Sequence, residues 1–198
     1  MNLGSGLRVV PGWMNVDGSI HAMCSRWPTR VLCWLYKHSD CQNTHSRDGY
    51  LQVIKQNQFV HHGLEYGVPY GDDTVDFIYS SHFLEHLFRE DAEALLRDAY
   101  RALKTGGCIR VAVPDLDHAV KLYQTGAKEE ALAFFFSLTG AAYLNQHHYM
   151  YDFELLKNLL EKVGFIKVQR CVFRQGTVPD VNVLDNRPEE TLFVEARK

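Results

Sequence analysis

The sequence predicts an α/β fold in which helices cover both faces of a doubly wound, mostly parallel sheet. Strand-like apolar runs alternate with helix-like patterns through the middle of the chain. The 198 residues are 46% hydrophobic and 23% charged, which suits a single domain over residues 1–198 with one apolar core. Ligands of such sheets bind beyond the carboxyl ends of the central strands, so polar residues at these ends are the first candidates for function.

The first two strands carry the most informative pattern. The opening strand ends in the turn Gly4-Ser5-Gly6, and the second strand is Met14–Asp17, too soon after the first for a helical crossover. Gly4 and Gly6 let a ligand approach the main-chain N–H groups. Asp17 can accept hydrogen bonds from two ribose hydroxyls. We therefore expect a nucleoside-bearing cofactor here.

The next part of the chain predicts helix, loop and a third strand. Apolar residues three and four apart in 19–39 indicate an amphipathic helix that is interrupted at Pro28. Residues 40–50 are polar and are expected to form a loop. Residues 53–60 lead into a short third strand near Gly63 and Leu64, and a turn-rich connection follows in 66–73.

The clearest strand is Val75–Tyr79, which ends at Ser80, Ser81 and His82. A helix with apolar residues at positions 92, 95, 96, 99 and 103 follows, until Gly106 and Gly107 stop it. Residues 108–113 then form a buried strand. The remaining elements are helices at 115–124, 127–138 and 153–163, the last capped by Asp152, and strands at 165–173 and 191–196, separated by the loop 174–190 and expected to form an antiparallel edge.

Several function classes are excluded by composition. The net charge is −3 and the basic residues are scattered, so no nucleic-acid partner is expected. Five cysteines without a C-x-x-C pair argue against disulfides and structural zinc and favour a cytoplasmic protein. The apolar stretch 31–36 is too short to span a membrane. A dinucleotide site would need a third glycine where Val9 stands, and there is no P-loop.

Three segments together resemble the class I S-adenosylmethionine-dependent methyltransferases, in particular short, type 11-like bacterial members. They are 2–17, with its glycine turn and Asp17; 75–87, with Ser80-Ser81-His82-Phe83-Leu84-Glu85-His86; and 101–107. The likeness extends over almost the whole chain. It implies a Rossmann-like, seven-stranded sheet with the last strand antiparallel, and S-adenosylmethionine as cofactor.

The resemblance also implies roles for single residues. Gly4, Ser5 and Gly6 would lie under the methionine moiety, with Asp17 on the ribose and Leu64 beside the adenine. Ser80 and Ser81 would complete the cofactor site. Gly63, which precedes Leu64, is also expected to bind the cofactor, although many relatives have at this position an aspartate whose contact with the adenine amine a glycine side chain does not provide. The first strand is expected to be weak because few residues precede the turn.

Methyl transfer needs alignment, desolvation and, for a hydroxyl acceptor, a base. Histidine suits the last role because its ordinary pKa is about 6.5. The candidates are His82, His86 and His148, of which His148 is favoured over His147. His82 serves equally well as a hydrogen-bonding group that shapes the crevice, and Glu85 with His86 suits a structural role at a helix start.

The pattern His82-x-x-Glu85-His86 also matches a zinc-peptidase motif, which would have to lie within a helix. Some ubiquinone-biosynthesis and small-RNA methyltransferases resemble this stretch and hold a metal with E-x-x-E-H. A divalent ion on His82, Glu85, His86 and His148 is therefore an alternative, although no metal is expected because most relatives need none.

The leading prediction is an enzyme that methylates a small molecule or a glycan sugar, at oxygen. The alternatives are a noncatalytic binding module that keeps the fold and, third, the zinc peptidase. The noncatalytic module would bind the donor without converting it. The sequence does not determine the acceptor or the oligomeric state.

Overall fold

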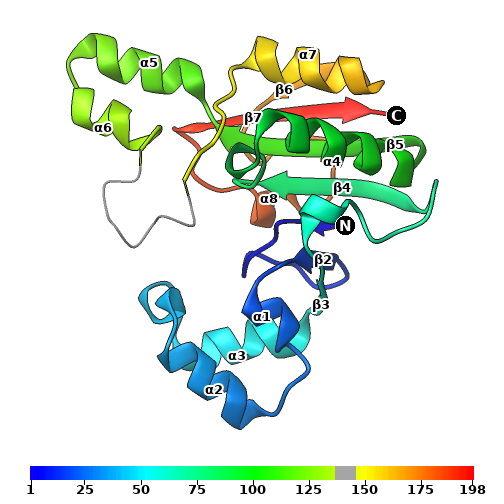
Figure 1. Ribbon diagram of the computed structural model, residues 1–198, viewed down its shortest axis with the longest axis vertical. Coiled ribbons are helices and arrows are strands. Elements are labelled where there is room, and N and C mark those ends of the chain that lie inside the picture. Colours follow the sequence, from blue (N-terminus) through cyan, green and yellow to red (C-terminus); the bar gives the residue numbers. More distant parts are fainter. Residues whose placement is uncertain (137–145) are drawn as a thin grey trace. The chain divides into compact units, whose positions relative to one another are not determined.

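The computed structural model describes residues 1–136 and 146–198 and confirms the α/β class. In the described residues, seven strands follow the order β3-β2-β1-β4-β5-β7-β6, and the last strand of the chain, β7, runs antiparallel to both of its neighbours, β5 and β6 (Figure 1). The chain divides into two compact units, an N-terminal unit of residues 1–66 and a C-terminal unit of residues 67–198, which are described in turn. A single domain over 1–198 stays a prediction.

Three parallel strands form the sheet of the N-terminal unit: β1 (Asn2–Leu3), β2 (Met14–Asp17) and β3 (Gln58–His61). Turns alone join β1 to β2, as the short spacing predicts. The buried Asn15 side chain ties the strands together: its Nδ2 donates to the carbonyl of Gln58 at 3.0 Å and its Oδ1 accepts from Asn2 Nδ2 at 3.1 Å. These bonds fix the register that places Asp17 at the carboxyl end of β2.

The helices of the N-terminal unit partly contradict the prediction. The break at Pro28 is confirmed, since it separates α1 (Ile20–Met23) from α2 (Thr29–Lys37). The loop predicted for 40–50 is wrong, because η1 (Asp40–Asn43) and α3 (Arg47–Gln56) begin there. Ser46 caps α3 by accepting the Gly49 N–H at 3.1 Å, and Tyr50 and Ile54, four residues apart, are buried. Polar composition hid this pattern.

The C-terminal unit contains β4 (Val75–Ser81), β5 (Leu103–Pro114), β6 (Ile166–Cys171) and β7 (Thr191–Arg197). β4 and β5 are parallel. The expectation of an antiparallel edge is confirmed, because β7 is antiparallel to β5 and β6 is antiparallel to β7, which leaves β6 as the outermost strand. The residues of β7 are almost all buried, as a central strand requires.

The helical elements of the C-terminal unit follow the predicted order. They are η3 (Leu84–His86), α4 (Arg89–Ala102), α5 (Leu116–Thr125), α6 (Lys128–Ala133), α7 (Phe153–Val163) and α8 (Val181–Leu184). Asp152 caps α7 as predicted. The end of the predicted helix 127–138 lies outside the described residues, and α6 ends at Ala133. The loop 174–190 contains α8.

Gly106 and Gly107 do not end a helix as predicted; they lie inside β5, which begins directly after α4. A Cβ on Gly107 would lie 2.8 Å from the carbonyl oxygen of Lys104 and 3.0 Å from that of Asp76. Glycine is therefore required because two stretches of backbone approach closely at the start of the strand.

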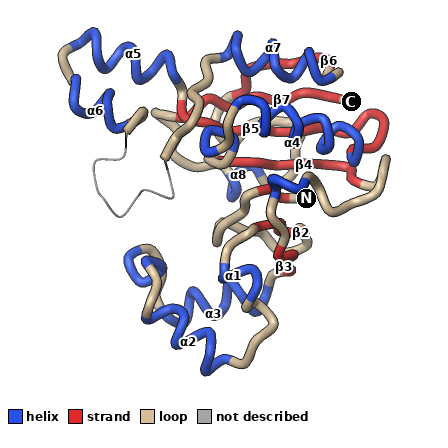
Figure 2. The backbone as a smooth tube through the Cα atoms, viewed as in Figure 1, coloured by secondary structure: helices blue, strands red, loops and turns tan. Residues whose placement is uncertain are grey.

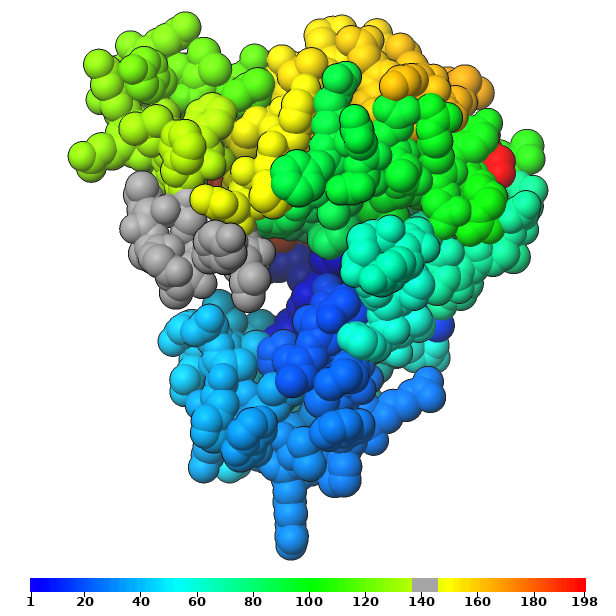
Figure 3. All heavy atoms as spheres, in the orientation of Figure 1, coloured from blue at the N-terminus to red at the C-terminus, as the bar shows by residue number. Residues whose placement is uncertain are grey.

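Different layers cover the two faces of the C-terminal sheet. α4 and α7 lie side by side (Figures 2 and 3), joined by an ion pair of 2.7 Å between Lys162 and Glu93. On the other face, the fully buried Arg110 of β5 contacts Asp185 at 2.6 Å and Glu195 at 3.1 Å. Asp185 therefore anchors the segment after α8 and does not face a ligand.

Among the described residues, none of the helices is both long and apolar enough to cross a membrane.

Candidate functional site

The glycine turn after β1 has the conformation that the sequence predicts. Gly4 and Gly6 have φ angles of 63° and 50°, in the left-handed region that favours glycine. The main-chain N–H of Gly4 donates to the carbonyl of Val16 at 2.9 Å, which holds the turn against β2. Nothing lies within 4 Å of the position that a Cβ on Gly6 would take, so a ligand atom can reach the backbone there.

Asp17 joins this turn, as its position in the sequence predicts. Its Oδ2 accepts the main-chain N–H of Gly6 at 2.8 Å, and its Oδ1 accepts that of Ser19 at 2.8 Å. Each carboxylate oxygen has two lone pairs, so one on each remains for a ligand hydroxyl. The half-buried carboxylate fits a ligand with two neighbouring hydroxyl groups.

The segment after β3 contains a residue that the sequence analysis missed. Leu64 begins the short helix η2 (Leu64–Tyr66) and is buried, with 3% of its surface exposed. The carboxylate of Glu65 folds back over Gly63, since a Cβ on Gly63 would lie 2.5 Å from Glu65 Oε1. An acidic group thus occupies the space next to residue 63, where relatives carry an aspartate. The only sequence signal for this role is the carboxylate of Glu65, two positions after Gly63.

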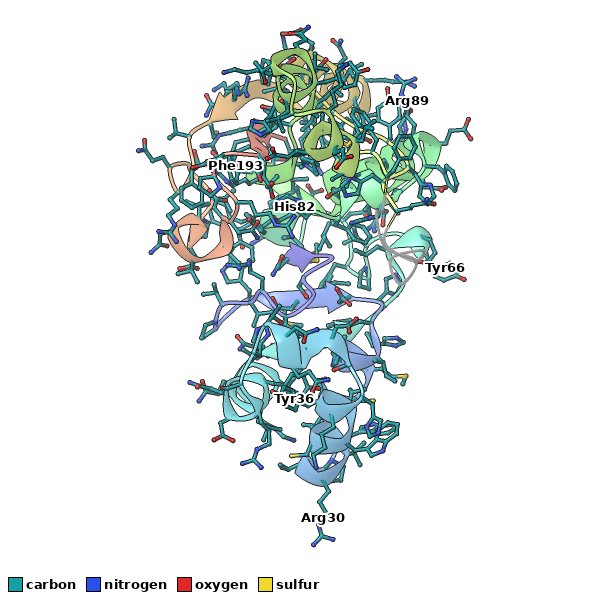
Figure 4. The ribbon with its side chains drawn as sticks, turned by 90° about the vertical axis from the view of Figure 1, so that its left-hand side faces the viewer. Arg30, Tyr36, Tyr66, His82, Arg89 and Phe193 are labelled. Carbon is teal, nitrogen blue, oxygen red and sulfur yellow. The ribbon has the colours of Figure 1, made fainter. Side chains whose placement is uncertain are left out.

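The end of β4 presents Ser80, Ser81 and His82. Ser80 is buried, and its Oγ has no hydrogen-bond partner among the described residues. His82 has a φ of 49°, an uncommon conformation outside glycine that is held by a 2.9 Å hydrogen bond from its N–H to the carbonyl of Ala112. Figure 4 shows His82 among the side chains of the sheet, whereas Arg30 projects outward.

Both ring nitrogens of His82 have neighbours. Nε2 lies 3.1 Å from the hydroxyl oxygen of Thr191 in β7, and Nδ1 lies 3.4 Å from Oε1 of the fully buried Glu85. If Nδ1 carries the proton, Nε2 accepts from the Thr191 hydroxyl, and Nδ1 lies near the carboxylate without forming a hydrogen bond to it. Thr191, 109 residues further along the chain, could not be assigned to this site from the sequence.

The histidine that lies near Glu85 and His86 is His147, not the predicted His148. His86 Nε2 lies 4.0 Å from Glu85 Oε1, and His147 belongs to the same group. Burial lowers the pKa of His147 below its usual value, despite the hydrogen bond to the Phe134 carbonyl. The ring of His148 instead stacks on Phe88, with 4.2 Å between ring centroids. The prediction that the His148 side chain joins Glu85 in a metal-binding group is thus wrong.

Residues 82–86 also do not form the α-helix that a zinc-peptidase motif needs. β4 ends at Ser81, and only the 3₁₀ turn η3 follows before α4 begins at Arg89. His82 is outside the group of ligand atoms that Glu85, His86 and His147 form.

Comparisons with known proteins agree with this geometry. The family model described as a methyltransferase domain matches residues 29–170. A SAM-dependent methyltransferase from Thermotoga maritima, a possible histamine N-methyltransferase, has 18% sequence identity and a TM-score of 0.53, with 100% of this chain and 80% of that chain covered. One from Archaeoglobus fulgidus has 17% identity and a TM-score of 0.53, covering 100% and 84%.

PigF with SAH is similar at 15% identity and a TM-score of 0.56, with 100% of this chain and 49% of that chain covered. At these identities the solved structures show a shared fold. No curated protein matches the sequence.

Proposed function

Because the chain belongs to the methyltransferase domain family and uses S-adenosylmethionine, we propose that it methylates an oxygen of a small molecule or of a glycan sugar. When bound, S-adenosylmethionine supplies a methyl group on a sulfonium, so the donor is already activated. The protein's own residues then have to bind both reactants, align them, exclude water and accept a proton.

The N-terminal unit provides the donor-binding residues of this proposal. Gly4, Ser5 and Gly6 present a bare main chain to the methionine part, and the free lone pairs of Asp17 accept the two ribose hydroxyls. Leu64 supplies an apolar surface for the adenine. We further assign to Glu65 the contact with the adenine amine, because its carboxylate lies over Gly63.

The C-terminal unit provides the base, which we assign to His82. The single observation that carries this assignment is the 3.1 Å contact between His82 Nε2 and the Thr191 hydroxyl, since the nitrogen already has a hydroxyl in the geometry that an acceptor would adopt. Glu85, 3.4 Å from Nδ1, orients the ring. Ser80, whose Oγ has no hydrogen-bond partner among the described residues, and Ser81 are assigned as further cofactor contacts at the end of β4.

His86 and His148 are weaker candidates for the base. His86 Nδ1 is 3.1 Å from the Gln146 carbonyl and its Nε2 is 4.0 Å from a Glu85 carboxylate oxygen, so neither nitrogen lies beside a hydroxyl as His82 Nε2 does. The exposed ring of His148 stacks on Phe88, so its orientation depends on a side chain that is itself exposed.

We keep a small molecule or a glycan as the proposed acceptor, and we propose no nucleic-acid partner. The five free cysteines support a cytoplasmic location.

The test is turnover with a panel of phenols, hydroxy acids and free sugars, with formation of S-adenosylhomocysteine as the readout. We expect at least one class of acceptor to accelerate this formation, and His82→Asn to lower kcat by about 100-fold or more, in the range typical of a general base. S-adenosylhomocysteine should bind both proteins equally. Donor binding without acceleration by any acceptor would instead support the noncatalytic binding module.

A further inference from the structure

The C-terminal unit contains a cluster of side chains that could bind a metal ion, and this cluster is not part of the proposed donor site. One ligand atom from each of Glu85, His86 and His147 lies within 4.8 Å of the other two. Glu85 is fully buried, and neither of its carboxylate oxygens accepts a hydrogen bond from a residue that the structure describes. A buried carboxylate without hydrogen-bond donors is unfavourable, and a bound cation would stabilise it.

The two histidines are already oriented as neutral ligands. Nδ1 of His86 lies 3.1 Å from the carbonyl oxygen of Gln146, and Nδ1 of His147 lies 2.6 Å from that of Phe134. A carbonyl oxygen only accepts, so each Nδ1 carries a proton, and Nε2 is the nitrogen that each ring can offer to a metal. Histidines that bind metals commonly donate their other N–H to a backbone carbonyl in this way.

We propose that Glu85, His86 and His147 bind a divalent transition-metal ion, with zinc as the best match. Two imidazole nitrogens and one carboxylate suit zinc, whereas magnesium and calcium prefer sites made of oxygen. Ligand atoms around a tetrahedral zinc lie about 3.4 Å apart. His86 Nε2 and Glu85 Oε1, now 4.0 Å apart, reach that spacing by a small ring rotation.

Three protein ligands leave one coordination position open, which is the arrangement of catalytic rather than structural zinc sites. The class of ligand that this position takes is an oxygen donor, such as water or a hydroxyl of a substrate. His82, with its Nδ1 3.4 Å from Glu85, lies outside the ligand set as a partner that orients the carboxylate. His147 takes the place that the sequence pattern gives to His148.

The test uses the full chain without an affinity tag, treated with chelator, dialysed and titrated with Co²⁺. We expect visible absorption bands that saturate at one equivalent of Co²⁺. Addition of Zn²⁺ should displace Co²⁺, and calorimetry should record this displacement. His86→Ala, His147→Ala and Glu85→Gln should each weaken Co²⁺ affinity by about 100-fold or more, beyond the usual effect of losing an outer partner. His148→Ala, adjacent in sequence but stacked on Phe88, is the matched control and should bind as the wild type does.

Lack of saturable binding by the wild type would overturn the site, and so would loss of binding in His148→Ala but not in His147→Ala. Circular dichroism checks that each variant is folded. If the change at buried Glu85 prevents folding, the two histidine variants decide alone, because both rings are partly exposed. Titration with S-adenosylhomocysteine separates this result from the proposed function: a protein that binds it but no metal loses only the metal site.

Discussion

At the scale of single residues, the donor site depends most on the carboxylate of Asp17. It holds the glycine turn through Gly6 and the start of α1 through Ser19, and it still has lone pairs for a ligand. In the proposed donor site, the same atoms therefore organise the turn and bind the donor. Binding then costs little rearrangement, because the polar groups are in place beforehand.

Asp17→Asn should weaken binding of S-adenosylhomocysteine by about 10- to 100-fold, because an amide replaces one charged acceptor with a donor. Isothermal titration calorimetry measures the change. Asp48→Asn, an exposed aspartate of α3 in the same unit, is the control and should leave Kd unchanged. Equal Kd values for all three proteins would remove Asp17 from the site.

Glu65→Ala tests the assigned contact with the adenine amine. We expect S-adenosylhomocysteine to bind about 2- to 10-fold more weakly to the variant, as for the loss of one hydrogen bond. S-inosylhomocysteine, which has an oxygen in place of the amine, provides the control ligand. The wild type should prefer the adenosyl compound and the variant should lose this preference; a preference that survives in the variant would contradict the assignment.

At the scale of elements, the Arg110 network joins β5, β7 and the segment after α8. Asp185 accepts from Arg110 Nε at 3.0 Å and Nη2 at 2.6 Å, and also from the main-chain N–H of Arg174 at 2.7 Å. Close packing continues at Gly176, where a Cβ would lie 2.1 Å from a Glu195 carboxylate oxygen. A buried charge network of this kind fixes one arrangement of the loop, since each charge needs its partner.

Asp185→Ala should lower the free energy of unfolding by about 3–5 kcal/mol, because it leaves a buried guanidinium with one partner fewer. The matched control is Asp72→Ala, which removes an exposed partner of Arg101 at 2.6 Å and should cost at most about 1 kcal/mol. Urea unfolding followed by circular dichroism gives both values. A similar small effect in both variants would mean that the buried network does not stabilise the loop.

The helices of the N-terminal unit provide a pH-dependent element at His21. Its Nδ1 lies 3.0 Å from the Tyr50 hydroxyl and its Nε2 lies 3.2 Å from Cys41 Sγ. Burial lowers the pKa of His21 and outweighs the opposing charge of Asp17. The unfolded chain then binds more protons than the folded one near pH 6, so stability is complete above about pH 6.5 and is lost as the pH falls.

His21→Gln should flatten this dependence. Between pH 7.5 and 5.5 the wild type is expected to lose more free energy of unfolding than the variant, which keeps a polar group next to Tyr50 but does not titrate. The measurement is urea unfolding at a series of pH values. Parallel curves for the two proteins would show that His21 is equally protonated in the folded and unfolded states.

At the scale of the whole molecule, alternating patterns were enough to predict the α/β fold and most elements, because apolar period and glycine position are local signals. The two late strands form the predicted antiparallel edge, but their order was not a local signal: β7 enters between β5 and β6, which leaves β6 outermost. Likewise α3 was hidden by its polar residues, because Tyr50 and Ile54 are its only fully buried positions.

The candidate site shows the same division. Gly6 and Asp17 lie close in sequence and were predicted to belong to one site, whereas the hydrogen bond between them is seen only in the structure. The Thr191 partner of His82 and the His147 member of the metal cluster come from distant segments, so only the fold reveals them. Adjacent histidines at 147 and 148 look equivalent in a sequence, although one ring faces Glu85 and the other stacks on Phe88.

The central claim is that the glycine turn and Asp17 bind S-adenosylmethionine, and one measurement tests it most directly. Calorimetric titration of the folded wild-type chain with S-adenosylhomocysteine should give a saturable signal at one site per chain. A folded protein, verified by circular dichroism, that shows no binding of this compound at millimolar concentration would contradict the account.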